Sequence, residues 1–123
     1  MTASDPVCTL CRPEDVVVAD EHAYVARDKF SLSPGHVIAV PRRHVADFFA
    51  MTREEKHAVL ALLDQAREQI DKEHRPDGYN IGVNIGAAAG QSRMHVHVHL
   101  IPRYSGDVPD PSGGVRCVLP RRT

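Results

Sequence analysis

The 123-residue chain has almost no net charge, few cysteines and no long apolar run. Its 15 lysines and arginines nearly balance its 16 aspartates and glutamates, so the formal net charge is −1. A chain with this balance has no basis for bulk electrostatic binding to nucleic acid or to a membrane surface. No apolar run approaches the ~20 residues that a membrane-spanning helix needs. We therefore expect neither a nucleic acid nor a membrane as a partner.

The three cysteines are an odd number, which argues against a disulfide framework. The first six residues, Met1–Pro6, carry neither the basic region nor the apolar core of a secretory signal. Both features favour a reducing, cytoplasmic setting. The length suits one compact domain over residues 1–123, with an N-terminal segment (1–15) and an extended C-terminal tail (103–123).

The most informative stretch is His95-Val96-His97-Val98-His99-Leu100-Ile101, in which three histidines alternate with apolar residues. Strict alternation with β-branched residues predicts a half-buried strand, because successive side chains point to opposite faces. The three imidazoles would then form a row on the face opposite the core. Burying three imidazoles is costly unless they are hydrogen-bonded, metal-bound or in contact with a ligand. This stretch therefore predicts a chemical site.

The rest of the chain predicts four further strands and one long helix. The helix begins at Thr52, with Glu55 completing a capping box, and ends before Pro76. A short helical turn is expected over residues 45–51. The other strands are expected at residues 16–19, 22–27, 36–40 and 79–84. Strands, one long helix and further strands in this order predict an α+β fold, with an antiparallel sheet and helices on one face.

The residues before the histidine stretch indicate a phosphate-binding site. The small residues of Gly86–Gly90 let a ligand approach the backbone closely, and free N–H groups there can hold an anion. Asn84, Gln91 and Ser92 add neutral hydrogen-bond donors at the same end. A neutral imidazole carries a free nitrogen near pH 7 and can attack phosphorus. His97 is best placed for this role, because it has a histidine on either side.

The C-x-x-C motif Cys8-Thr9-Leu10-Cys11 suits either a redox pair or half of a zinc site. A redox motif is expected to lead into a helix, but the turn-forming residues 12–15 follow here. Half of a zinc site needs two more ligands from elsewhere in the chain. From spacing alone, both interpretations stay open.

The His-φ-His-φ-His-φ-φ pattern of His95–Ile101 resembles the signature of the histidine triad (HIT) family. The segment Pro34–His44 and the combination of Asn84 with Gly90-Gln91-Ser92 are also similar to that family, so the resemblance covers nearly the whole chain. It implies a HIT-like antiparallel five-stranded sheet with one long helix and a short helix on one face. It also implies that the protein binds a nucleotide and hydrolyses or transfers its nucleoside monophosphate.

The resemblance assigns roles to individual residues. His97 would be the nucleophile that attacks the α-phosphate and becomes nucleotidylated. His99 would hold the α-phosphate oxygens on the leaving-group side, and His36 would complete the polar cluster. Asp28 would accept the ribose hydroxyls, with an ordinary loop aspartate as the alternative, and the base pocket would lie along Tyr24 to Phe30. The phosphate contacts would fall to three neutral side chains: Asn84, Gln91 and Ser92.

The resemblance also implies a structural zinc ion. Many bacterial members look similar in joining such a C-x-x-C to two histidines, which correspond here to His44 and His95. Cys8, Cys11, His44 and His95 would form a closed Cys₂His₂ set, which suits a structural ion rather than a catalytic one. The alternative is two buried thiols, with His95 hydrogen-bonded inside the cluster.

The tail residues Asp110–Arg116 resemble bacterial members described as dinucleoside polyphosphate hydrolases. The leading hypothesis is therefore a hydrolase that cleaves at the α-phosphate of dinucleoside polyphosphates, with adenine favoured, through a covalent His97 intermediate. A nucleoside phosphoramidase and a nucleotide-binding regulatory module with little turnover are the alternatives. A further class is a metal-dependent hydrolase with an ion on the three triad histidines.

Partners and cofactors follow from the same resemblance. HIT domains commonly pair, so we expect a homodimer. Arg116 would reach a distal phosphate or the partner subunit, with an ordinary surface arginine as the alternative. Whether magnesium accompanies a polyphosphate substrate is left open.

Overall fold

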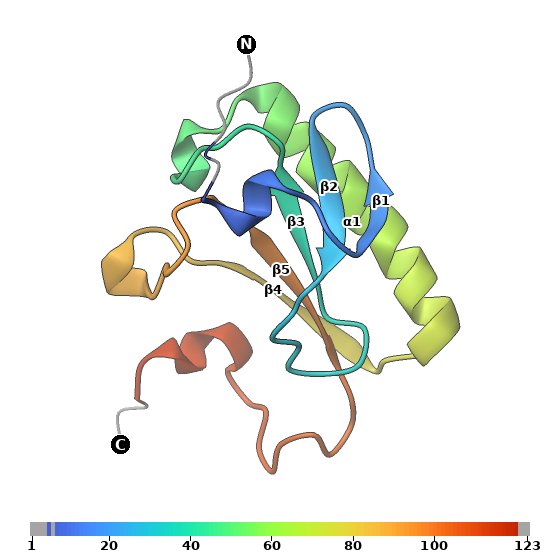
Figure 1. The fold of residues 1–123 in the computed structure, drawn as a ribbon. Coiled ribbons are helices and arrows are strands. Elements are labelled where there is room, and N and C mark those ends of the chain that lie inside the picture. Colours follow the sequence, from blue (N-terminus) through green and yellow to red (C-terminus); the bar gives the residue numbers. More distant parts are fainter. Residues whose placement is uncertain (1–4, 6, 121–123) are drawn as a thin grey trace.

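The fold is that of a computed structural model, which describes residues 5 and 7–120 (Figure 1). Five strands form one antiparallel sheet in the order β1-β2-β3-β5-β4. The strands are β1 (Val16–Ala19), β2 (Ala23–Arg27), β3 (Val37–Pro41), β4 (Gly78–Val83) and β5 (Val98–Arg103). One long helix, α1 (Arg53–His74), lies between β3 and β4 in the sequence. The predicted α+β fold is confirmed.

Short 3₁₀ helices complete the described part of the chain: η1 (Thr9–Cys11), η2 (Phe48–Ala50), η3 (Ala87–Ala89) and η4 (Gly114–Val118). The element η2 replaces the helical turn expected over residues 45–51. The element η4 lies in the tail and carries Arg116, whose side chain is exposed. Within residues 5 and 7–120, no helix combines the length and apolar character needed to cross a membrane.

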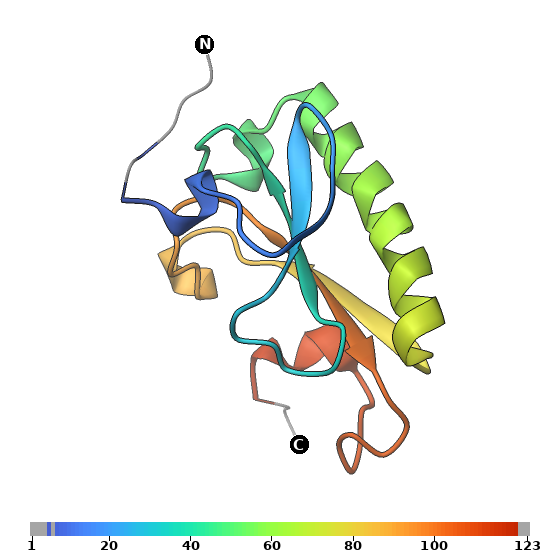
Figure 2. The ribbon, with the colours of Figure 1, turned by 45° about the vertical axis from the view of Figure 1, so that its right-hand side comes forward.

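One face of the sheet is covered by α1 (Figure 2). The opposite face carries the histidines. On the covered face, Ala39 of β3 and Leu100 of β5 pack with the apolar side of α1 in the main core. On the other face, Ile38 and Val40 pack with Leu10 of η1 in a smaller cluster. Alternation along each strand therefore separates the core residues from the residues that can build a site.

The start of α1 is stabilised by the predicted capping box. The backbone N–H of Glu55 donates to the Thr52 hydroxyl at 3.0 Å, and the Thr52 N–H donates to the Glu55 carboxylate at 2.8 Å. Arg43 also holds Glu55, with Nη2 at 2.8 Å from Oε1. Arg75 ends the helix in the left-handed conformation (φ 52°), directly before Pro76 as predicted.

Replacing Thr52 with alanine is expected to lower the free energy of unfolding by about 1 kcal/mol, because the Glu55 N–H loses its acceptor. Urea unfolding of the wild type and the variant measures this loss. The Thr52→Ser variant keeps the hydroxyl and is expected to stay close to the wild type. An equal loss in both variants would show that the threonine methyl group, and not the capping hydrogen bond, stabilises this helix start.

The strand predicted over His95–Ile101 is observed three residues later, as β5 over Val98–Arg103. The pairing of β5 with both β3 and β4 begins at Val98, so the chain before it is no longer part of the sheet, and pairing with β3 extends only to Leu100. There the Val96 N–H donates to the carbonyl of Val45 at 2.8 Å. Pro102 is tolerated within β5 because pairing with β3 has ended before it.

Gly35 fixes the turn that leads into His36. Its φ of 90° lies in the left-handed region. A Cβ at this position would lie only 3.0 Å from His74 Cδ2 and 3.1 Å from Ile70 Cγ2 at the end of α1. Glycine meets both the dihedral and the steric requirement, and the turn thereby holds the start of β3 against the helix.

Candidate functional site

A cavity of about 530 Å³ lies on the histidine face of the sheet. This volume is within the range of about 300–1,000 Å³ that is usual for ligand pockets. The structure brings all seven predicted catalytic and nucleotide-site residues to its wall: Asp28, His36, Asn84, Gln91, Ser92, His97 and His99. The apolar part of the wall consists of Phe30, Leu32, Ile81, Ile101, Val115 and Val118.

One hydrogen bond fixes the position of the proton on the His97 ring. Nδ1 lies 3.0 Å from the backbone oxygen of His95. A carbonyl oxygen can only accept, so Nδ1 carries the hydrogen and Nε2 keeps a free lone pair in the neutral ring. Burial lowers the pKa of His97, which keeps the ring neutral at pH 7. His97 therefore places a neutral, nucleophilic ring at the cavity wall.

A chain of hydrogen bonds orients His36 and His99. The Leu32 N–H donates to Nδ1 of His36 at 3.0 Å, so the neutral His36 ring carries its hydrogen on Nε2. This Nε2 lies 3.0 Å from Nδ1 of His99. When it donates to His99, the hydrogen of the His99 ring lies on its own Nε2. His99 then has an N–H with which to bind a ligand oxygen.

The carboxylate of Asp28 is turned towards these two histidines. One of its oxygens accepts from the Phe30 N–H at 2.9 Å. The other lies 3.3 Å from Nε2 of His36 and 3.5 Å from Nδ1 of His99. Its side chain is only 5 % exposed. Asp28 therefore contacts the histidine cluster in this structure, and its role as a ribose ligand stays a prediction.

The burial of His36 makes the stability of the protein dependent on pH. Burial lowers the pKa of His36, and the Asp28 carboxylate offsets this only in part. In the unfolded chain a histidine has a pKa of about 6.5, so the unfolded state binds the proton first as the pH falls. The free energy of unfolding is thus expected to decrease as the pH drops below about 6.5, and to level off below the lowered folded-state pKa.

Urea unfolding between about pH 5 and about pH 8 measures this dependence. The His36→Gln variant is expected to show a smaller decrease, because it lacks one titrating group. The matched control is His57→Gln, which removes an exposed histidine of α1. If His36→Gln and His57→Gln have the same pH dependence as the wild type, burial of His36 does not govern acid stability.

The amide of Gln91 is fully used in bracing the loop around the cavity. Its Nε2 donates to two backbone carbonyls at 2.8 and 3.1 Å, and its Oε1 accepts from the Gly86 N–H at 2.8 Å. Gln91 is 6 % exposed, whereas Asn84 and Ser92 are exposed. Asn84 and Ser92 are thus the more accessible of the predicted phosphate donors.

Two features of the site were missed by sequence reasoning. Arg93 lines the cavity, and its charge adds to the effect of burial in lowering the pKa of His97 and of His99. Its position directly after Ser92 was the available signal. The apolar wall was also missed, although alternation places Ile101 on the same face as the two histidines.

The segment expected to form the base pocket divides between two cavities, with Tyr24, Ala26, Arg27 and Lys29 lining a smaller one beside η1, and its role stays a prediction. The histidine-lined cavity takes Asp28 and Phe30 from this segment. Tyr24 is 1 % exposed, and its hydroxyl donates to the carbonyl of Leu10 at 2.6 Å. This tyrosine holds η1 against the sheet.

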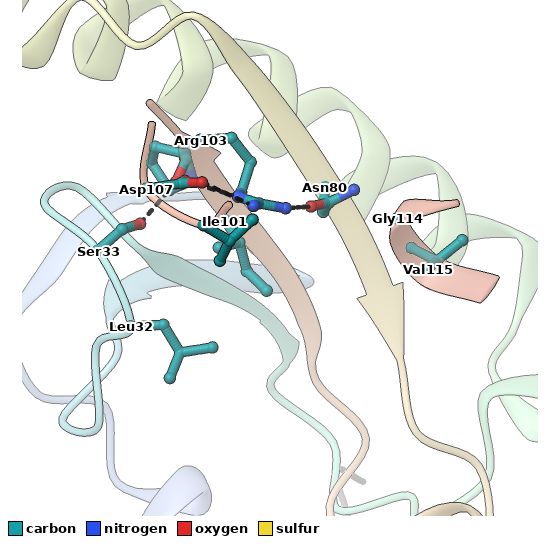
Figure 3. A pocket seen from close by; sticks show the side chains of 10 residues that line it. Leu32, Ser33, Asn80, Ile101, Arg103, Asp107, Gly114 and Val115 are labelled. Atoms are coloured by element: carbon teal, nitrogen blue, oxygen red, sulfur yellow. Dashed lines mark hydrogen bonds and ion pairs between the residues drawn. The ribbon is translucent and has the colours of Figure 1, made fainter. Parts of the chain in front are cut away.

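Figure 3 shows the lining of a second cavity of about 420 Å³, which shares part of its wall with the first. The residues that line both are Leu32, Asn80, Ile101 and Val115. Arg103 lies in its wall, with Nε and Nη2 each 2.8 Å from a carboxylate oxygen of Asp107. Its Nη1 donates to the side-chain oxygen of Asn80 at 2.6 Å. The charge of Arg103 is therefore neutralised within the wall.

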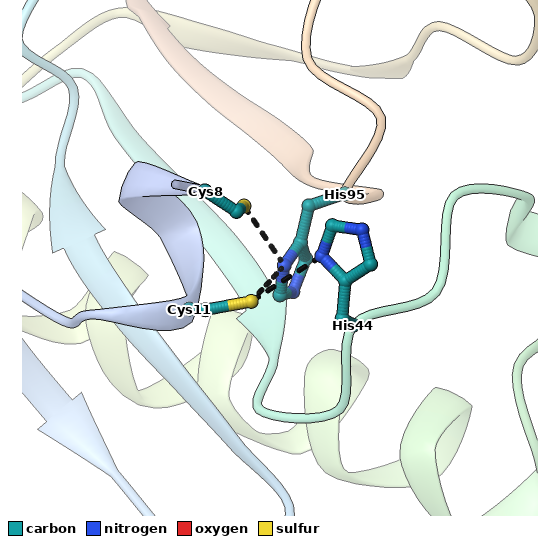
Figure 4. Close-up of side chains that lie close together, drawn as sticks. All are labelled: Cys8, Cys11, His44 and His95. Carbon is teal, nitrogen blue, oxygen red and sulfur yellow. Dashed lines mark hydrogen bonds between the residues drawn. The ribbon is translucent and has the colours of Figure 1, made fainter. Parts of the chain in front are cut away.

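The two cysteines of the C-x-x-C motif meet two histidines (Figure 4). Sγ of Cys11 lies 3.3 Å from Nδ1 of His44, and Nδ1 of His95 lies 3.5 Å from both sulfurs. His95 donates from Nε2 to the carbonyl of Pro41 at 2.7 Å, so its Nδ1 is a free lone pair that faces the sulfurs. The ligand atoms of all four residues lie within 4.8 Å of one another.

A catalytic ion on the three triad histidines is not supported by their geometry. In the described part of the chain, His95 groups with the cysteines, whereas His99 groups with Asp28 and His36. His97 belongs to neither group. Hydrogen bonds account for the second group, because the Leu32 N–H occupies Nδ1 of His36 and leaves the hydrogen on Nε2.

The fold and the cavity together define a small α+β protein with a histidine-lined ligand site on the open face of its sheet. Residues 10–106 match the family model described as the HIT domain. The chain belongs to the HIT family, as its triad motif predicted.

Individual relatives agree with this membership. An AP-4-A phosphorylase of Mycobacterium tuberculosis is 36% identical over 93 residues, which are 75% of this chain and 48% of the relative. A bifunctional bis(5'-adenosyl)-triphosphatase/adenylylsulfatase of Arabidopsis thaliana is 30% identical over 95 residues, 77% of this chain and 53% of the relative. The chain spans about half the length of these two relatives. The crystal structure of a HIT family protein from Bacillus anthracis has a TM-score of 0.78 and 31% identity, covering 85% of this chain and 78% of that one.

Proposed function

We propose that this protein is a nucleotide hydrolase that cleaves at the α-phosphate and releases a nucleoside monophosphate through a covalent nucleotidyl-His97 intermediate. The observation that carries the proposal is the hydrogen bond from His97 Nδ1 to the backbone oxygen of His95, which leaves Nε2 as a free nucleophile beside the cavity. His99, held by His36 and through it by the Leu32 N–H, supplies the next hydrogen bond to the phosphate from its Nε2.

The reaction proceeds in two displacements. In the first, the lone pair of His97 Nε2 forms a bond to the α-phosphorus, and the bond to the leaving group breaks with its electron pair. A phosphate leaving group departs as the anion, and an amine also takes up a proton from water. In the second, water attacks the phosphorus, the P–N bond breaks back to Nε2, and the water proton passes to solvent.

Dinucleoside polyphosphates are the favoured substrates. The names of the Mycobacterium tuberculosis and Arabidopsis thaliana relatives refer to such molecules, and both names point to adenine. Nucleoside phosphoramidates are the second candidate class. They are favoured by the pairing of Arg103 with Asp107 in the second cavity, because this pair offers a polyphosphate no net positive charge.

Product analysis by chromatography tests the proposed activity. Diadenosine tetraphosphate and adenosine 5′-phosphoramidate are offered separately to the wild type, and AMP is expected from at least one. Turnover is expected to persist with a chelator when the phosphoramidate is the substrate. If AMP binds but neither substrate is cleaved, the protein is a nucleotide-binding module and not a hydrolase.

The Cys8, Cys11, His44 and His95 cluster would hold a structural Zn²⁺. Two ligands at about 2.0–2.3 Å from a tetrahedral ion lie roughly 3.5 Å apart, which is close to the observed sulfur–nitrogen distances of 3.3–3.5 Å. The free Nδ1 of His95 faces the sulfurs, as a ligand atom must. The ion would tie η1 to the chain before β5 and so hold the first triad histidine in place.

The homodimer implied by the family is part of the proposal. Edge strand β4 has a free side in the described chain, and it carries Ile81, which is 57% exposed. Leu60 of α1 is 64% exposed. These features are compatible with a second copy at this edge, and sedimentation analysis of the purified protein tests it.

A further inference from the structure

The second cavity continues the site along β5. On the histidine face, His99, Ile101 and Arg103 follow one another along β5 at every second residue, about 7 Å apart, and the His97 ring lies before them with its centroid 5.0 Å from that of His99. His99 therefore lies between His97 and Ile101, and Ile101 lines both cavities. The two cavities thus meet on the side of His99 that faces away from the nucleophile.

This order sets the path of the leaving group. In a displacement at phosphorus, the attacking and leaving atoms lie roughly in line on opposite sides. With the phosphorus held at His99 and the attack coming from His97, the leaving atom lies on the side of Ile101. The cavity of about 420 Å³ begins there.

The wall of the second cavity is suited to an uncharged ligand. Leu32, Val108 and Val115 are 77%, 41% and 57% exposed, so a ligand can bury their apolar surfaces. Arg103 adds no net charge, because the carboxylate of Asp107 holds its guanidinium at 2.8 Å on two nitrogens. A flat ring would cover the apolar walls better than a phosphate group could.

Building on the proposed function, we propose that the second cavity binds the leaving group and selects leaving groups that end in an uncharged flat ring. Two kinds of substrate share this chemistry. One is a dinucleoside polyphosphate, whose far nucleoside supplies the ring. The other is a nucleoside phosphoramidate of an aromatic amine.

Three substrates and two variants test the subsite. Val108 lines the second cavity and not the first, and Val108→Asn removes its apolar contact without adding charge. The variant is expected to lower kcat/KM about fivefold for diadenosine tetraphosphate and for the adenosine phosphoramidate of tryptamine. For unsubstituted adenosine phosphoramidate, which has no ring to bind there, kcat/KM is expected to stay within about twofold. Leu119→Asn is the matched control, since Leu119 is 72% exposed and lines neither cavity.

The outcomes separate the subsite from the proposed activity. A loss confined to one of the two ring-bearing substrates supports the subsite and identifies its natural source of ligand. An equal loss for all three substrates, or no loss beyond that of Leu119→Asn, overturns the subsite. Failure of the proposed function would appear differently, as absence of AMP release by the wild type from every substrate.

Discussion

The His97→Gln variant is expected to lose turnover, with kcat reduced at least about 10⁴-fold. The variant lacks Nε2 of His97. This nitrogen is free at the cavity wall because Nδ1 carries the hydrogen and donates it to the His95 carbonyl. A glutamine amide nitrogen has no comparable lone pair, so the nucleotidyl intermediate cannot form. Chromatographic measurement of AMP release from diadenosine tetraphosphate or adenosine 5′-phosphoramidate, whichever the wild type cleaves faster, gives the ratio of the wild-type kcat to that of the variant.

Binding separates this effect from damage to the fold. Calorimetric titration with AMP is expected to give the variant an affinity within about tenfold of the wild type, because His99, Ser92 and Asn84 are retained. The control His57→Gln makes the same substitution at an exposed histidine of α1 and is expected to leave kcat unchanged. Wild-type turnover by His97→Gln would mean that another group is the nucleophile.

The second large effect is expected from Cys11→Ser. Sγ of Cys11 contacts both His44 and His95, so the substitution would remove the zinc ligand that lies next to both histidine ligands. We expect one zinc ion per chain in the wild type and none in the variant. A structural zinc site contributes to folding free energy directly, so the variant is expected to lose roughly 3 kcal/mol, or roughly 10 °C in Tm.

Cys117→Ser is the matched control, because Cys117 lies in η4 and outside the four-residue cluster. It is expected to keep both the zinc content and the Tm of the wild type. Metal analysis and thermal unfolding with and without a strong chelator measure both quantities. If the wild type contains no zinc and a chelator leaves its Tm unchanged, the cluster is a pair of thiols hydrogen-bonded to histidines.

Most of the fold could be predicted because its signals are local. The Thr52 capping box and Pro76 bound α1, and alternation along the strands separates core from site. The start of β5 was placed three residues too early, since alternation continues through His95–His97 although pairing with β3 does not. The last pair of the two strands joins Ala39 to Val98, so where pairing stops depends on β3, which lies far away in the chain.

The candidate site was predictable in membership but not in geometry. The family resemblance groups His95 with the cysteines and His97 with the phosphate, yet it does not show that the free ring nitrogen is Nδ1 in His95 and Nε2 in His97. That difference depends on two backbone carbonyls, those of Pro41 and His95. The second cavity was not predictable at all, because its wall joins a loop, two strands and the tail.

The stereochemistry at the α-phosphorus tests the central claim most directly. A substrate made chiral at this atom is hydrolysed by the wild type, and the configuration of the released nucleoside monophosphate is determined. Two successive in-line displacements, through a nucleotidyl-His97 intermediate, predict net retention of configuration. Inversion would show a single direct attack by water and would contradict the covalent mechanism.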